Sequence, residues 1–206
     1  MAGLRTSFTV RSGVEAIVGG RAAWRFRPHY HAGDEIVRLL AGRARLRTAA
    51  GCREVSAGQN VVVAAGTVHR FEPVDAEGWA FSSEFVLREN AKSREAAADT
   101  DLTERAIELL KGREGLRTDT ERIARVCGVS AGHLSRSFRR VTGTGLHNFH
   151  VVMVLQKAKD LLRVGAPLAA TAFDSGFYDQ AHLTREFVRT YGFTPNAFRT
   201  AWAGRA

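Results

Sequence analysis

The sequence predicts a two-domain protein, in which an N-terminal all-β domain is followed by a C-terminal all-α domain. Val- and Phe-rich runs separated by glycines extend from about Thr9 to Val86, and helical spacing of apolar residues begins at about Asp101. Short apolar runs with regular turn signals are typical of a β-sandwich or barrel. Apolar residues that recur at three and four positions are typical of helices. We place the first domain, with a trailing helix, at residues 1–95 and the second domain at residues 96–206.

The first domain is expected to consist of short strands joined by glycine turns. The runs expected to form strands are, in chain order, FTVRSGVEAIV (8–18), EIVRLLAG (35–42), ARLRTAAG (44–51), QNVVVAAG (59–66) and WAFSSEFVL (79–87).

The second domain is expected to consist of short helices. Residues 88–111 are rich in helix formers and contain neither Gly nor Pro, so they are expected to form one or two bridging helices. Beyond them, glycines and prolines interrupt the apolar periodicity and keep the helices short. The exception is LHNFHVVMVLQKAKDLL (146–162), which predicts one connecting helix of about four turns.

Charge and composition narrow the class of protein. The net charge is +9, and residues 101–206 hold sixteen basic and ten acidic side chains, which favours a polyanionic partner such as nucleic acid. Cys52 and Cys127 match no zinc spacing and are expected to be reduced thiols. No apolar run approaches the roughly 18 residues of a membrane helix, and the opening MAGLRTSFTVRSG lacks a signal-peptide core, so we expect a cytoplasmic protein with no membrane partner.

An eight-residue pattern, H-L-[ST]-R-x-F-x-R, occurs twice in the second domain. HLSRSFRR occupies 133–140 and HLTREFVR occupies 182–189. In each copy the Leu and the Phe are four residues apart and share one helix face, so they are expected to pack inwards. The polar residues of the pattern then point outwards, towards solvent or a partner.

The residues upstream of each copy complete a helix-turn-helix pattern. Gly128 and Gly176 can supply the left-handed conformation of a sharp turn, and Ser130 and Asp179 are good N-caps for the second helix. A helix-turn-helix places its second helix in the major groove of double-stranded DNA. Two units joined by a connecting helix predict one recognition helix for each of two successive grooves. A helical hairpin with a purely structural role is the alternative for either copy alone.

These residues carry a family resemblance. GFYDQAHLTREFVRTYGFTPNAFR (176–199) closely resembles the C-terminal signature of the AraC family of transcription regulators, and ARVCGVSAGHLSRSFRRVTG (124–143) resembles the family's first helix-turn-helix. The resemblance implies a homodimer and a set of residues that face bases or backbone. That set is Gly132, Ser135 and Arg136 in the first recognition helix, and Gln180, Ala181, Thr184 and Arg185 in the second.

Three neighbours, Ser130, His133 and Arg139, are added to the predicted DNA-binding set. His133 is expected either to contact a phosphate or simply to be exposed at the surface. Gly132 offers no side chain for reading a base, and Val154 stands where the family usually has an Arg. We therefore expect the first recognition helix to contribute less sequence specificity than the second.

The first domain contains a second resemblance. PHYHAGDEIVRLLAG (28–42) and GQNVVVAAGTVHRFEP (58–73) resemble the two motifs of the cupin superfamily of small β-barrels, although Ala64 replaces the usual Pro. Residues two apart on a strand share a face, so His29 and His31 would both point into the barrel. Glu35 and His69 can join them there, and three imidazoles with a carboxylate suit zinc, iron, nickel or manganese.

Two other roles for this cluster stay open, a small-molecule pocket without metal and a purely structural site. The position of Arg25 and Arg27 along the predicted strand hints at an anionic effector. We expect a transcription regulator, not an enzyme, whose cupin-like domain senses a small molecule or a metal ion. The alternative is a metal-dependent cupin enzyme, such as a dioxygenase or isomerase, with a DNA-binding appendage.

Overall fold

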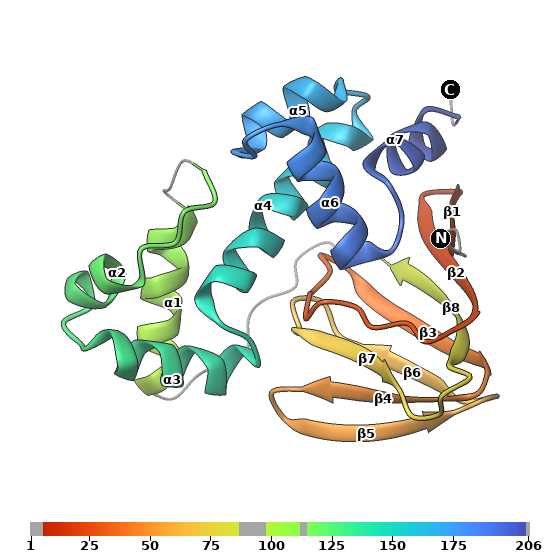
Figure 1. Cartoon of the computed structure of the whole chain (residues 1–206), viewed down its shortest axis with the longest axis horizontal. Coiled ribbons are helices and arrows are strands. Elements are labelled where there is room, and N and C mark those ends of the chain that lie inside the picture. The colour runs from red at the N-terminus through yellow and green to blue at the C-terminus, as the bar shows by residue number, and fades with distance from the viewer. Residues whose placement is uncertain (1–5, 87–97, 112–114, 205–206) are drawn as a thin grey trace.

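The computed structural model describes residues 6–86, 98–111 and 115–204, in which strands are followed by helices (Figure 1). The strands are β1 (Thr6–Arg11), β2 (Val14–Ala22), β3 (Asp34–Ala41), β4 (Arg43–Thr48), β5 (Gly51–Ser56), β6 (Asn60–Val63), β7 (His69–Pro73) and β8 (Trp79–Val86). The helices are α1 (Ala98–Lys111), α2 (Thr120–Val126), α3 (Ala131–Thr142), α4 (Leu146–Arg163), α5 (Leu168–Ser175), α6 (Gln180–Tyr191) and α7 (Pro195–Ala203).

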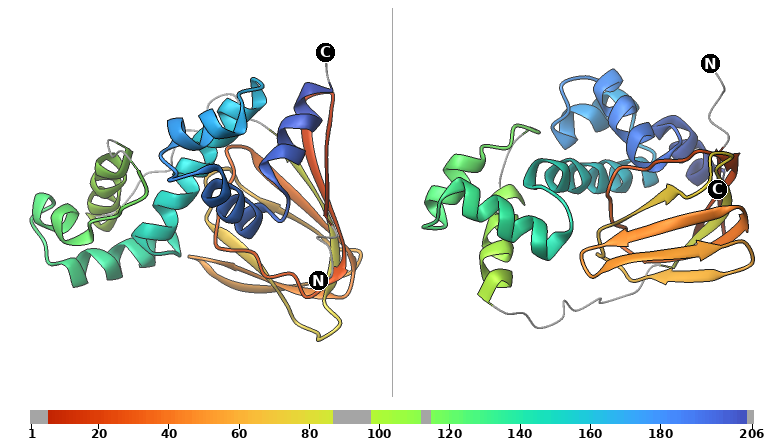
Figure 2. Two further views of the ribbon diagram at one scale, coloured as in Figure 1. Left: turned by 45° about the horizontal axis from the view of Figure 1, so that its top comes forward. Right: turned by 60° about the horizontal axis from the view of Figure 1, so that its bottom comes forward.

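The strands form two antiparallel sheets, with the order β1-β2-β8-β3-β6 in the larger and β5-β4-β7 in the smaller. Side chains alternate along each strand. In β3, for example, Val37 and Leu39 are each 1% exposed, whereas Ile36 and Leu40 are 37% and 50% exposed. The inward side chains of both sheets meet in one core around Trp79, and the helices gather at one side of the sheets (Figure 2). An all-β domain followed by helices is therefore confirmed.

The segment around the first two histidines differs from the sequence prediction. All five predicted runs contain strands, but His29 and His31 do not lie on one. His29 forms only a single bridge with His69, in which the two backbone N–H···O=C distances are 2.9 and 2.8 Å. This bridge holds the loop against β7, and the two side chains point inwards without regular strand alternation.

The two helix-turn-helix units form as the sequence predicts. Ser130 caps α3 by accepting a hydrogen bond from the backbone of His133, and Asp179 caps α6 by accepting one from the backbone of His182. Gly176 has a φ of 88°, and a Cβ there would lie 2.9 Å from backbone atoms of Gly115. Only glycine fits this turn, because both the positive φ and the close approach exclude a side chain.

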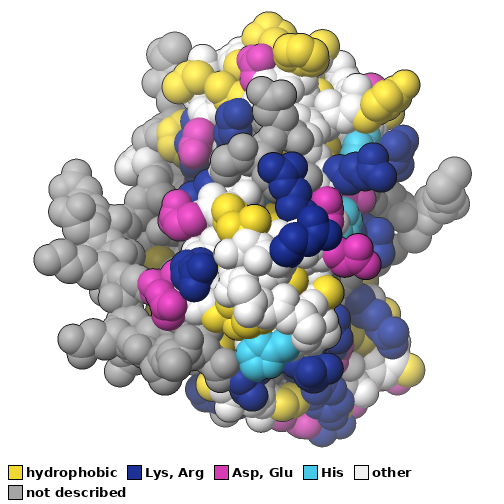
Figure 3. All heavy atoms as spheres, turned by 90° about the vertical axis from the view of Figure 1, so that its left-hand side faces the viewer, with side chains coloured by type: hydrophobic (Ala, Val, Ile, Leu, Met, Phe, Trp, Pro, Cys, Tyr) yellow, Lys and Arg dark blue, Asp and Glu magenta, His cyan; other side chains and the backbone are white. Residues whose placement is uncertain are grey.

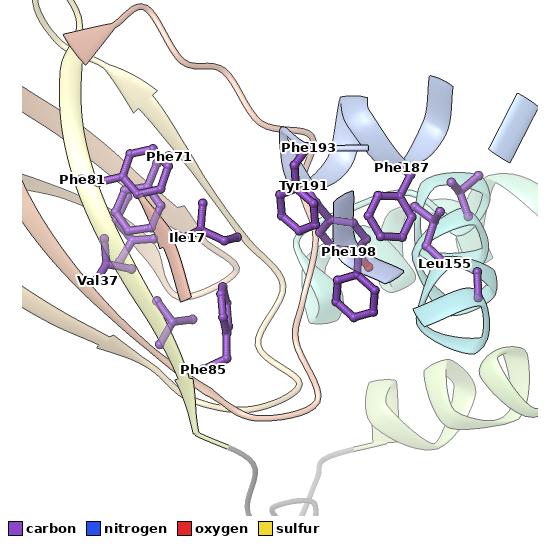
Figure 4. Close-up of a cluster of buried hydrophobic side chains, with 14 of the residues drawn as sticks. Ile17, Val37, Phe71, Phe81, Phe85, Leu155, Phe187, Tyr191, Phe193 and Phe198 are labelled. Atoms are coloured by element: carbon purple, nitrogen blue, oxygen red, sulfur yellow. The ribbon is translucent and has the colours of Figure 1, made fainter. Parts of the chain in front are cut away.

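The two hydrophobic cores group the helices and strands differently from the two domains that the sequence predicts. The barrel core continues into α4–α7, so Phe81 and Phe85 belong to the same cluster as Phe187 and Tyr191 (Figure 4). A second cluster joins α1 to α2 and α3. The second helix-turn-helix unit thus packs with the barrel, and the first unit packs with α1.

The predicted boundary between residues 95 and 96 lies outside the described residues, as does any helix before Ala98. Helix α1 belongs to the C-terminal part, because Leu102, Ala106 and Leu110 pack with Leu134 and Phe138. The apolar side of α1 is therefore used within the chain.

A buried ion cluster ties the barrel to the helices. Glu15 of β2 lies 3.0 Å from Nζ of Lys159 and 2.8 Å from Nη2 of Arg163, both on α4. Trp202 of α7 donates a hydrogen bond of 3.2 Å to the same carboxylate. Because Glu15 and Lys159 are 3% and 4% exposed, each charge depends on the other for compensation.

Two predictions from composition can be compared directly with the structure. Both cysteines are free, with Cys52 exposed and Cys127 buried. Among the described helices, none combines the length and the apolar character that crossing a membrane requires.

Candidate functional site

Helix α3 presents a polar stripe to solvent. Leu134 and Phe138 are fully buried, as the repeated pattern predicts, and they fix the rotation of the helix. The five predicted DNA-facing residues of α3 are consequently exposed, namely Gly132, His133, Ser135, Arg136 and Arg139. A Cβ on Gly132 would lie 3.4 Å from Nη1 of Arg136. The guanidinium of Arg136 thus lies on the helix surface next to Gly132, which has no side chain.

Helix α6 presents the equivalent stripe. Leu183 and Phe187 are fully buried, and Gln180, Ala181 and Arg185 are exposed. Thr184 is half-buried, and its hydroxyl donates a hydrogen bond of 2.8 Å to the carbonyl of Gln180. Among the predicted residues, Ser130 has a structural task as well, since its hydroxyl caps α3 at 3.2 Å.

An arginine-rich groove runs between the barrel and the helices, a feature that sequence reasoning missed. One part, of about 520 Å³, is lined by Arg47 and Arg70 from the barrel and by Arg139 from α3. The adjoining part, of about 570 Å³, adds Arg25 and Arg189. Viewed from the side of α1–α3, basic side chains gather towards the lower part and the right-hand edge (Figure 3). The one hint of this groove in the sequence was the last Arg of the repeated pattern, which is Arg189 in α6.

Arg25 and Arg27, whose position along the predicted strand hinted at an anionic effector, do not line the histidine cavity. Both line the outer groove, and the guanidinium of Arg27 pairs with Glu186 of α6. Alternation of inward and outward side chains applies only to a regular strand, and residues 23–28 form none.

The four predicted metal-site residues do lie together, in the interior of the barrel. His29, His31, Glu35 and His69 are between 2% and 6% exposed. Nδ1 of His29 lies 2.6 Å from the carbonyl oxygen of Arg27, and Nδ1 of His69 lies 3.0 Å from that of Thr67. A carbonyl oxygen only accepts, so each Nδ1 carries the proton and each Nε2 lone pair is directed elsewhere. Metal-binding imidazoles are typically held in this way.

The remaining polar atoms of the cluster converge without satisfying one another. Oε2 of Glu35 is 2.8 Å from Nε2 of His69 and 3.6 Å from Nε2 of His31. The alignment is poor, so Glu35 Oε2, His69 Nε2 and both ring nitrogens of His31 lack a hydrogen-bond partner among the described residues. Unsatisfied buried polar atoms are costly and require an explanation, such as an ion or a water.

Burial sets the protonation of the cluster. Burial, reinforced by the neighbouring His69, lowers the pKa of His29 to about 4. Burial likewise lowers the pKa of His31 well below its ordinary value. Burial alone would lower the pKa of His69 too, but the adjacent Glu35 carboxylate outweighs this and raises it. At neutral pH His29 and His31 are therefore neutral, which is the form that binds a metal.

The residues fit a divalent transition metal. One ligand atom from each of the three histidines lies within 4.8 Å of the other two. Two imidazole nitrogens on a tetrahedral zinc ion are about 3.4 Å apart, so the widest pair must approach by up to about 1.4 Å. The cavity holds about 20 Å³, and a single water needs roughly 10–15 Å³. The site has room for an ion together with about one water.

Part of the cavity wall comes from outside the barrel. Phe85 and Ser83 line it from β8, whereas Thr190 and Tyr191 line it from the last turn of α6. The ring centroid of Tyr191 is 6.0 Å from that of His29 and 6.1 Å from that of His31. No feature of the sequence placed the second recognition helix against the histidines.

The fold of the chain is similar to that of ToxT from Vibrio cholerae O395. The crystal structure of ToxT matches with a TM-score of 0.57 at 12% sequence identity, over 94% of this chain and 100% of that one. A structure of ToxT from strain SCE256 with an unsaturated fatty acid bound matches with a TM-score of 0.53 at 10% identity, over 94% and 96% of the chains.

Sequence comparisons agree with the two predicted resemblances. Residues 17–77 match a cupin domain, and residues 123–201 match a helix-turn-helix domain. Over 83 residues, or 39% of this chain, the protein is 36% identical to the HTH-type transcriptional regulator GlxA of Rhizobium meliloti strain 1021. The match spans 25% of the length of GlxA. The chain thus contains a region that matches a cupin domain, followed by a region that matches a helix-turn-helix domain.

Proposed function

We propose that this protein is a transcription regulator that binds double-stranded DNA through α3 and α6 and senses a metal ion in its cupin domain. The observation that carries the proposal is the pair of exposed stripes, each centred on an arginine above a buried Leu and Phe. Arg136 and Arg185 can each form the bidentate contact with guanine that is commonest in specific recognition. GlxA, a transcriptional regulator by name, supports the same function.

The geometry of the cupin cavity favours a metal effector over an organic one. The fatty acid in the related ToxT fold raises the alternative of an apolar ligand. Pockets for drug-sized ligands measure roughly 300–1,000 Å³, whereas this cavity holds about 20 Å³. Three side chains with unsatisfied ligand atoms, His31, Glu35 and His69, meet beside that small space. Zinc, iron, nickel and manganese all suit three imidazoles with a carboxylate.

The same small cavity argues against the alternative of a cupin enzyme. A metal-dependent dioxygenase or isomerase needs an open coordination position that a substrate can reach. Here Tyr191 covers the histidines and is 2% exposed. An ion bound at this site would serve as a signal. The protein would act in the cytoplasm, where its DNA target is found.

Alanine at Arg185 is expected to weaken binding to a selected DNA duplex by about 1–3 kcal/mol, because it removes one bidentate base contact. Arg136→Ala is expected to reduce sequence discrimination less than Arg185→Ala, since Gly132 leaves α3 with fewer side chains that can read bases. The measurement is fluorescence anisotropy, between 50 and 200 mM salt, on a duplex selected from a random pool.

Arg53 provides a matched control for that experiment. It is an exposed arginine on β5, away from both recognition stripes. Arg53→Ala is expected to leave affinity and salt dependence unchanged. If Arg185→Ala binds the selected duplex as tightly as the wild-type protein does, α6 is not a recognition helix and the proposal fails.

The protein is also expected to form a homodimer through the outer face of the larger sheet. Apolar side chains on that face are between 37% and 64% exposed, a patch of the kind that marks interfaces. The residues are Val18, Ile36, Leu40, Val62 and Val86. The paired change Ile36→Lys and Val62→Lys places two charges on neighbouring strands. Light scattering should then give the 22.5 kDa mass of one chain instead of twice that mass, and a wild-type monomer would contradict the prediction.

A further inference from the structure

We propose that Thr190 of α6 belongs to the metal site, so that occupancy of the barrel and the position of the second recognition helix are coupled. This inference rests on the proposed metal-sensing function. It adds a residue that is supplied by the DNA-binding domain and lies outside the cupin motifs.

The hydroxyl of Thr190 is buried without a partner. Thr190 is 0% exposed and lines the histidine cavity, and its Oγ1 has no hydrogen-bond partner within the described part of the chain. A helical threonine usually satisfies its hydroxyl by bonding back to the carbonyl four residues earlier. Thr184 of the same helix does so, at 2.8 Å from the carbonyl of Gln180. Thr190 is therefore a hydroxyl left available to the contents of the cavity.

The coordination chemistry of the site suggests a hydrogen-bonding role for the Thr190 hydroxyl. The three histidines can supply three ligands, and zinc held by three protein ligands keeps its fourth position for a water. A hydroxyl next to that water can accept or donate a hydrogen bond. Outer partners of this kind typically change metal affinity by 10–100-fold. The hydroxyl of Thr190 would hold a water ligand of the bound ion.

The same helix connects this contact to the proposed DNA-binding surface. Thr190 lies five residues after Arg185, which is about 7.5 Å along a rigid helix. Tyr191 follows directly, and its hydroxyl lies 3.3 Å from Nε2 of Gln156, which also donates to the carbonyl of Tyr30 in the barrel. Metal binding thus holds the last turn of α6 against the barrel. By linkage, the factor by which metal changes DNA affinity must equal the factor by which DNA changes metal affinity.

Thr190→Val tests the role of the hydroxyl, because valine keeps the shape and removes only the polar atom. In the full-length protein, zinc affinity measured by chelator competition is expected to fall at least about 10-fold. Stability without metal is expected to stay the same or rise, because an unsatisfied buried hydroxyl is replaced by a methyl group. These opposite changes distinguish a metal-site role from a merely structural one. Thr190→Ser, which retains the hydroxyl, is expected to keep zinc affinity within a few-fold of the wild-type value.

Thr171 supplies the matched control. It is also 0% exposed with an unpartnered Oγ1, but it lies on α5, away from the histidine cavity. Thr171→Val is expected to leave zinc affinity unchanged. If Thr190→Val does not fold, Thr190→Ala removes the same hydroxyl without adding atoms and gives the same test.

Hydrogen exchange gives a second measurement that does not depend on affinity. Zinc is expected to slow exchange of the amides at 187–191 in the wild-type protein, and to slow it less in Thr190→Val. If the wild-type protein binds zinc and Thr190→Val binds it equally well, the inference is overturned while metal sensing stands. If the wild-type protein binds no zinc, iron, nickel or manganese, metal sensing itself fails.

Discussion

Replacing Glu15 by glutamine is expected to lower the free energy of unfolding by about 3–5 kcal/mol, because it leaves a buried ammonium without its counter-ion. Lys159 is 4% exposed, and its Nζ lies 3.0 Å from Oε2 of Glu15. Burial lowers the pKa of Lys159 even though Glu15 raises it. The rings of Tyr191 and Phe198 lie 5.2 and 5.1 Å from Nζ, which helps but does not replace a carboxylate.

The stabilisation from this cluster depends on pH in a defined direction. Burial would raise the pKa of Glu15, but the charges of Lys159 and Arg163 outweigh burial and lower it below the ordinary value of 4.5. A carboxylate with a lowered folded-state pKa stabilises fully above its unfolded value and loses that contribution as the pH falls through the folded value. We therefore expect the contacts between β2 and α4 to weaken in acid below about pH 4.5.

Urea unfolding, followed by helical circular dichroism and by tryptophan fluorescence, measures the Glu15→Gln effect. Glu72 provides the control, because it pairs with Arg47 at 2.7 Å and the two side chains are 25% and 43% exposed. Glu72→Gln is expected to change stability by at most about 1 kcal/mol. Equal effects of the two substitutions would mean that the buried cluster does not hold the barrel to the helices.

The double substitution His29→Ala/His31→Ala is expected to abolish metal binding, because it removes two of three converging imidazoles. The wild-type protein is expected to retain one metal ion per chain, as measured by mass spectrometry of the purified protein. Free metal at one hundred times its Kd should stabilise the wild-type fold by about 2.7 kcal/mol. That stabilisation, read as a shift in Tm, should be absent in the double variant.

Two surface histidines control for the loss of imidazoles as such. His133 and His147 are exposed and lie outside the cavity. The variant His133→Ala/His147→Ala is expected to keep the metal and the Tm shift. Stoichiometric metal in the His29→Ala/His31→Ala protein would place the ion elsewhere and remove the basis for a metal sensor in the barrel.

The sequence predicted the helix-turn-helix units well because their determinants are local. A Leu and a Phe four residues apart specify which face of α3 or α6 is buried, whatever lies behind that face. An N-cap residue and a turn glycine shape only the backbone within a few residues of their own position, as Ser130 and Gly176 do here. Exposure of Arg136 and Arg185 follows directly from this pattern.

The sequence identified the histidine cluster correctly, but the structural reason it assumed was wrong. Strand alternation predicted that His29 and His31 share a face, but the segment is a loop that makes one bridge with His69. The four residues of the cluster come together because the fold of the whole barrel brings this loop, β3 and β7 side by side. Alternation also misplaced Arg27, which lies outside the cavity and pairs with Glu186.

The sequence by itself determined the class of each half, the two exposed polar helix faces and the four candidate ligands, since these depend on periodicity, capping and short motifs. Only the tertiary structure decided that α6 packs with the barrel core, that Thr190 and Tyr191 wall the cavity, and that Glu15 meets Lys159. Periodicity reports which face of a helix avoids water but not what that face packs against. Contacts between residues more than a hundred positions apart leave no local signal, because they are set by how two finished surfaces fit together.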